Sequence, residues 1–350
     1  MPLDDTYQPC TRADSAPAVV LCGLADTGAA LSAVRSLGEP GLRVILIAES
    51  DCPPARYSRH CSRFVHVPGF SRHPLRLARA LREIEGEWGI APVVFATGAA
   101  DLKALRQVMP ALGPRIRPVP APAERPAERP VALPAPVQIE APAPQGERVT
   151  VEIYLRPDGE VGACCSSRAL TPEHADRPVT RESVSRPALE TRAAQVLTEI
   201  GHRGIAHIDF QHDPRTGEYR LLAMHPLPSP WHLLATRSGH NLPLLAWREA
   251  CGLPAARAPR RRTGLRHVDE VQAWRDWQAQ PDAGSRRWLP LLGVLMRPGT
   301  VRQTLGLGDP GPALQLARAW LARRGIWREA PHRPTATLFE EAERPCLRGR

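Results

Sequence analysis

The stretch that decides the fold is residues 204–226, GIAHIDFQHDPRTGEYRLLAMHP. Gly204–Phe210 and Glu218–Met224 have the period of two that is typical of half-buried strands. Between them, Asp213–Gly217 contains the aspartate, proline and glycine that favour a turn. Residues 204–226 are therefore predicted to form a β-hairpin.

Three side chains of this hairpin could form a site. Because side chains alternate between the faces of a strand, His207 and Asp209 share one face of the first strand. Ala223 and His225 share one face of the second. If the strands pair, two imidazoles and one carboxylate could meet, a set able to bind Zn²⁺, Fe²⁺ or Ni²⁺. The competing interpretation is that both histidines are only structural, hydrogen-bonded groups.

Residues 17–112 alternate apolar runs with helical periods. The expected strands are Ala18–Leu21, Arg43–Ala48, Phe64–Val67 and Val93–Thr97. The expected helices are Gly28–Leu37, Pro74–Trp88 and Asp101–Met109. Strands that alternate with helices predict an α/β domain with an open, Rossmann-like parallel sheet.

The rest of the chain divides into three parts. Residues 113–147 hold ten prolines in 35 residues, which predicts a Pro/Ala-rich, semi-rigid linker without helix or central strand. Residues 148–252 are expected to form an α+β lobe with locally paired strands. Residues 253–350 are expected to be mostly helical, with a helix at Ala313–Arg323 and a frayed tail.

Several stretches together resemble the ATP-grasp carboxylate–amine ligases. The hairpin resembles the metal-binding hairpin of that family, and Arg56–Pro68 resembles the domain that precedes its catalytic lobe. Val149–Leu155, Asn241–Trp247 and Asp309–Pro312 resemble later parts of the family. The resemblance covers most of residues 17–112 and 148–315. It implies a pre-ATP-grasp domain, a truncated ATP-grasp lobe, and chemistry in which ATP and Mg²⁺ activate a carboxylate for attack by an amine.

The sequence departs from the family pattern where that chemistry is carried. Asp209 stands at the first acidic position of the hairpin, but Ala223 and His225 stand where the family has Glu and Asn. The lysines of the family come from a subdomain that should fall near residues 113–147, and Lys103 is the only lysine of this chain. Arg168 is the residue that could contact phosphate instead, or it is a surface arginine.

The composition limits the class of protein further. The formal net charge is +10, but the arginines are dispersed and no nucleic-acid-binding motif is present, so we expect no nucleic-acid partner. The longest apolar run is too short to cross a membrane. Eight cysteines without a regular framework, and an N-terminus unlike a signal peptide, predict a cytoplasmic protein.

These observations predict an ATP-grasp homologue with an eroded catalytic set. Its expected role is that of a non-catalytic or accessory protein, which binds a catalytically complete ligase, another protein or a small carboxylate. The alternative is an active ATP- and Mg²⁺-dependent carboxylate–amine ligase with a divergent site built on Asp209 and arginines.

Overall fold

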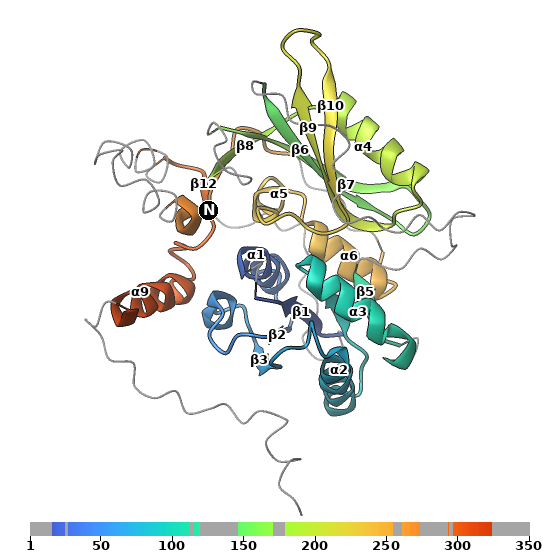
Figure 1. Cartoon of the computed structure of the whole chain (residues 1–350), viewed down its shortest axis with the longest axis vertical. Helices are drawn as coiled ribbons and strands as arrows, with labels where there is room; N and C mark the ends of the chain where they lie inside the picture. Colours follow the sequence, from blue (N-terminus) through green and yellow to red (C-terminus); the bar gives the residue numbers. More distant parts are fainter. Residues whose placement is uncertain are drawn as a thin grey trace, which may run out of the picture.

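The computed structural model consists of two β-sheets with helices around and between them (Figure 1). It describes residues 16–24, 27–112, 115–119, 146–170, 179–254, 261–273, 293 and 297–323. Within these residues, no helix has both the length and the apolar character needed to span a bilayer.

The first sheet contains five parallel strands in the order β3-β2-β1-β4-β5. The strands are β1 (Ala18–Cys22), β2 (Val44–Ala48), β3 (Arg63–His66), β4 (Val93–Phe95) and β5 (Arg117–Val119). They are connected by helices α1 (Thr27–Gly38), α2 (Pro74–Trp88) and α3 (Ala99–Leu112) and by the 3-10 helix η1 (Pro54–Tyr57). Because α1 covers one face and α2 and α3 the other, β1 and β2 are buried along their whole length. The predicted Rossmann-like parallel sheet is confirmed.

This sheet extends beyond residue 112, where the linker was expected to begin. Residues 117–119 form β5, in which Pro118 lies beside Val94 of β4. Proline cannot donate to a strand ladder, but β5 is an edge strand, where one row of N–H groups needs no partner. The structure thus corrects the linker prediction for these residues, while residues 120–145 lie outside the described part of the chain.

The second sheet contains seven strands in the order β10-β9-β6-β7-β8-β11-β12. The strands are β6 (Arg148–Leu155), β7 (Val161–Ala169), β8 (Thr180–Val184), β9 (Gly204–His212), β10 (Tyr219–His225), β11 (Arg266–Val268) and β12 (Thr300–Arg302). Neighbouring strands are antiparallel except β11 and β12. The predicted α+β lobe is confirmed, and β8 is a strand that the sequence analysis missed.

The described part of the C-terminal region contains strands as well as helix. It contributes β11 and β12 to the second sheet, and then helix α9 (Gly311–Arg323), which contains the helix predicted at residues 313–323. The predicted frayed tail falls in residues 324–350, which lie outside the described residues.

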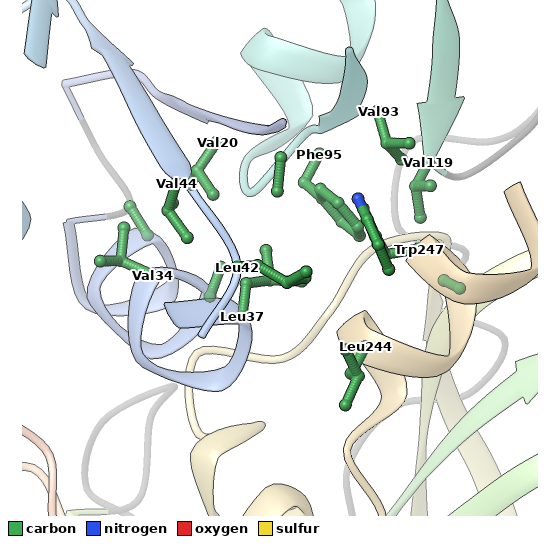
Figure 2. Close-up of a cluster of buried hydrophobic side chains, with 14 of the residues drawn as sticks. Val20, Val34, Leu37, Leu42, Val44, Val93, Phe95, Val119, Leu244 and Trp247 are labelled. Atoms are coloured by element: carbon green, nitrogen blue, oxygen red, sulfur yellow. The ribbon is translucent and has the colours of Figure 1, made fainter. Parts of the chain in front are cut away.

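The two faces of the second sheet have different partners. Helix α4 (Pro187–Glu199) packs on one face over an apolar core. Helices α5 (Leu233–Arg237) and α6 (Leu242–Ala250) lie between the two sheets (Figure 1). Figure 2 shows Trp247 of α6 beside Phe95 of the first sheet. The Trp247 side chain is fully buried, and its Nε1 donates to the Ala16 carbonyl oxygen at 3.0 Å, so one apolar core joins both sheets.

A buried ion pair fixes the C-terminal region against the first sheet. The Arg35 Nε on α1 donates to Asp309 Oδ2 at 2.9 Å, and its Nη1 donates to the Gln303 carbonyl oxygen at 2.6 Å. Burial alone would raise the pKa of Asp309, but hydrogen bonds from Ser58 and the Arg59 N–H, together with the Arg35 guanidinium, lower it. Asp309 is therefore ionised and holds α1, η1 and the start of α9 together.

Removing this carboxylate should destabilise the fold strongly. We expect Asp309→Ala to lower the free energy of unfolding by about 3–5 kcal/mol, because it leaves the Arg35 guanidinium buried without its counter-charge. Urea denaturation followed by circular dichroism measures the loss. Glu83→Ala is the matched control, since it breaks the partly exposed i,i+4 pair with Arg79 and should lower stability by about 0.5 kcal/mol or less. Equal effects of the two substitutions would contradict the assignment.

Candidate functional site

Opposite the face covered by α4, the second sheet presents polar side chains from five neighbouring strands. These residues, which we call the polar face, are His225 (β10), His207 and Asp209 (β9), Thr150 and Glu152 (β6), Ser167 (β7) and Arg181 (β8). Strand register places them side by side, with Asp209 opposite Thr150 and Thr150 opposite Ser167. The polar face is therefore a direct product of the period of two and of the strand order.

The structure brings together the three hairpin residues that the sequence singled out. His207 lies directly opposite His225, and their rings stack with centroids 4.4 Å apart and planes inclined by 15°. His225 Nε2 lies 3.7 Å from Asp209 Oδ2. One possible ligand atom from each residue can be chosen so that all three lie within 4.8 Å of one another.

Asp209 is held from one side by residues that the sequence analysis did not single out. Thr150 donates its hydroxyl proton to Asp209 Oδ1, and Arg181 Nη2 donates to Thr150 Oγ1. The Arg181 Nε also donates to Ser167 Oγ at 3.1 Å. This chain of hydrogen bonds fixes the Asp209 carboxylate and leaves Oδ2 as the oxygen that faces His225.

His207 is oriented by the chain that follows the hairpin. Its Nδ1 lies 2.9 Å from the Leu227 carbonyl oxygen, which can only accept, so Nδ1 carries the proton. Burial lowers the pKa of His207, and the ring is neutral at pH 7. Trp231 packs edge-on against this ring, with centroids 6.2 Å apart, and lies under the Arg181 guanidinium at 4.3 Å. Trp231 therefore contacts the polar face at both β9 and β8, through His207 and Arg181.

A second carboxylate, Glu152, lies on the polar face next to His207. Its side chain is fully buried, and Ser229 donates a short hydrogen bond to its Oε1. Burial raises the pKa of Glu152 to about 7, against the smaller lowering effects of Ser229 and Arg181. The signal for Glu152 and Thr150 was present in the alternation Val149-Thr-Val-Glu-Ile-Tyr154. No such alternation pointed to Arg181, because the strand that carries it, β8, was not predicted from the sequence.

The hairpin carries no carboxylate on its second strand. Ala223 lies opposite Asp209, and its methyl group stands where the resemblance places a glutamate. The donor set at the hairpin is therefore one carboxylate and two imidazoles. Imidazole is a poor ligand for Mg²⁺, which prefers oxygen, so this donor set does not fit Mg²⁺.

Arg168, the candidate for phosphate contact, and Lys103, the only lysine, both lie away from the polar face. Arg168 follows Ser167 in β7 and so points to the opposite face of the sheet. Its guanidinium pairs with Glu182 at 2.7 Å and with Glu147 at 3.5 Å. Lys103 is exposed on α3, which belongs to the first sheet. The structure thus brings neither residue next to Asp209.

Comparisons with known proteins identify the fold. No family model matches the sequence, and no curated protein is similar to it in sequence. Among solved structures, biotin carboxylase from Campylobacter jejuni is similar, with a TM-score of 0.51 and 12% identity over 71% of this chain and 74% of that one. Pyruvate carboxylase from Rhizobium etli gives a TM-score of 0.50 and 13% identity over 72% of this chain.

The chain has an ATP-grasp fold. It spans 30% of the length of the pyruvate carboxylase, and at this level of identity the likeness establishes the fold alone.

Glu152 should make stability depend on pH. Its folded-state pKa of about 7 exceeds that of an unfolded glutamate, so the folded state keeps a proton that the unfolded state loses, and stability falls as pH rises from about 4.5 to 7. Glu152→Gln removes this titration. The unmodified protein should lose about 2–3 kcal/mol of stability through this group between pH 4.5 and pH 8, and the variant should not. The free energy of unfolding of Glu152→Gln minus that of the unmodified protein should therefore increase by this amount over the same range. Urea titrations at both pH values measure the change.

Glu218→Gln, at an exposed position of the hairpin turn, is the control and should show no such pH dependence. A Glu152→Gln profile parallel to that of the unmodified protein would refute the assigned protonation of Glu152.

Proposed function

We propose that this chain is a non-catalytic or accessory protein with an ATP-grasp fold, which binds a partner protein or a small ligand and does not ligate. The observation that carries the proposal is Ala223, which faces Asp209 and offers no second carboxylate on the hairpin. A metal ion that bridges transferring phosphates needs several oxygen ligands from protein and substrate. Here the neighbouring donors are imidazoles.

The absence of lysine from the polar face supports the same proposal. Phosphoryl transfer depends on cations that neutralise the charge of the moving group. Arg181, the cation of the polar face, is buried, and its guanidinium already donates to Thr150 and Ser167. These hydrogen bonds would have to break before its Nε and Nη2 could bind a phosphate.

An active ATP-dependent carboxylate–amine ligase with a divergent site is the second candidate, and Glu152 favours it. Glu152 and Asp209 place two carboxylates on neighbouring strands of one face. The biotin carboxylase of the same fold was solved as a complex with β-γ-ATP. If Glu152 turned away from Ser229, it could supply the oxygen ligand that Ala223 lacks.

Nucleotide binding separates the two candidates. Isothermal titration calorimetry of the full chain with ATP and excess Mg²⁺ should give no binding heat up to millimolar nucleotide. Micromolar affinity that is lost in Asp209→Asn and in Glu152→Gln would overturn the accessory role in favour of the divergent ligase. Surface Glu218→Gln controls for nonspecific charge effects, since it lies at the hairpin turn.

The accessory role also implies a partner, and a catalytically complete ATP-grasp ligase of the same cell is the candidate. Coexpression of the tagged chain with that ligase, followed by light scattering on the purified fraction, measures whether a complex of defined mass forms. A monomeric chain beside a free ligase would remove the ligase from consideration.

We also propose a cytoplasmic location, which is supported by six free cysteines among the described residues.

A further inference from the structure

We propose that His207, Asp209 and His225 bind one divalent first-row transition metal ion, such as Zn²⁺, through three protein ligands. This inference goes beyond the accessory role and does not depend on it. The three donor atoms already lie within 4.8 Å of one another. Donors of a tetrahedral zinc site are separated by about 3.3 Å, because each lies about 2.0–2.1 Å from the ion. The site can therefore close by rearrangement of these side chains alone.

The hydrogen bond to Leu227 prepares His207 as a ligand. Since Nδ1 donates to the Leu227 carbonyl oxygen, the neutral ring has its lone pair on Nε2. A histidine that binds a metal ion commonly donates its other N–H to a carbonyl or carboxylate in the same way, which fixes both the tautomer and the ring. Trp231, packed against the ring, restricts it further.

The Asp209 carboxylate, the second ligand, is also held in position by its neighbours. Thr150 holds Oδ1, and Arg181 holds Thr150, so the carboxylate cannot rotate freely. Its second oxygen, Oδ2, is already 3.7 Å from His225 Nε2. Ala223 lies opposite Asp209 and presents only a methyl group, so it does not compete for Oδ2 as a hydrogen-bonding partner.

His225 is the ligand that has to move. A metal ion lies in the plane of each imidazole that binds it, and two nearly parallel stacked rings cannot both point at one ion. The His225 side chain is 31% exposed, whereas His207 is buried and hydrogen-bonded. The His225 ring therefore turns out of the stack on binding, and this exposed side gives the ion and its fourth ligand, a water or a small anion, access to the site.

The surrounding charges and the donor types select the metal. The negative charge of Asp209 offsets the positive charge of Arg181, which is linked to it through Thr150, so a dication is not repelled by the polar face as a whole. Two imidazole nitrogens and one carboxylate oxygen suit Zn²⁺, Fe²⁺, Co²⁺ and Ni²⁺, and they discriminate against Mg²⁺ and Ca²⁺.

The test is a Zn²⁺ titration of the full chain after removal of metal with a chelator. Isothermal titration calorimetry should give one site of micromolar or higher affinity, and millimolar Mg²⁺ should not compete. His225→Ala and Asp209→Asn should each weaken binding at least tenfold. The control is His212→Ala, which removes a histidine from the same hairpin whose ring contacts Tyr219 instead; its affinity should not change.

Thiols elsewhere in the chain could also bind Zn²⁺, so the ligand type needs its own measurement. Absorption of the Co²⁺ form should show ligand-field bands without the intense thiolate-to-cobalt band, and His225→Ala should abolish them. Circular dichroism verifies that each variant is folded. No binding at tens of micromolar Zn²⁺, a thiolate spectrum, or unchanged affinity in both His225→Ala and Asp209→Asn would overturn the site. None of these results bears on the Mg²⁺-ATP titration, which alone decides the accessory role.

Discussion

The rest of the structure depends on the buried guanidinium of Arg35. A charge removed from water has to be matched by an opposite charge and by acceptors, and those of Arg35 come from residues more than 260 positions later in the chain. Asp309 and the Gln303 carbonyl oxygen supply them. Through its side chain, Gln303 donates to the Gly28 carbonyl oxygen and bonds His267 of β11. One buried charge on α1 thus fixes the position of the C-terminal strands in the second sheet.

The polar face follows from how the second sheet is then assembled. Between the sheets, α6 fills an apolar core with Trp247, while the chain after β10 supplies Leu227, Ser229 and Trp231 to the polar side chains. Leu227 fixes the tautomer of His207, and Ser229 donates a hydrogen bond to Glu152. Trp231 packs between His207 and Arg181. The polar face is consequently a set of pre-oriented groups, which suits the binding of an ion or small ligand. The Arg181 guanidinium, the cation of this face, already donates to Thr150 and Ser167.

Sequence reasoning succeeded where the local pattern carries the information. The buried run at residues 44–48 and the amphipathic helix at residues 74–88 lie where they were predicted, because a parallel strand and a surface helix each imprint their own period on the sequence. It failed at β5 and β8. Proline-rich residues 117–119 become a strand only because an edge of the first sheet accepts them, and Thr180–Val184 becomes one because two neighbouring strands pair with it. Neither reason is local.

The same division holds for the site. The sequence alone determined that His207 and Asp209 share a face, that Ala223 and His225 replace the residues expected on the second strand, and that Lys103 is the only lysine. These are matters of composition and of the period of two. Only the tertiary structure decided that Glu152 lies beside His207 and that Arg181 acts on Asp209 through Thr150. The physical reason is that neighbours across a sheet are set by strand order, and strand order is fixed by long-range burial and pairing.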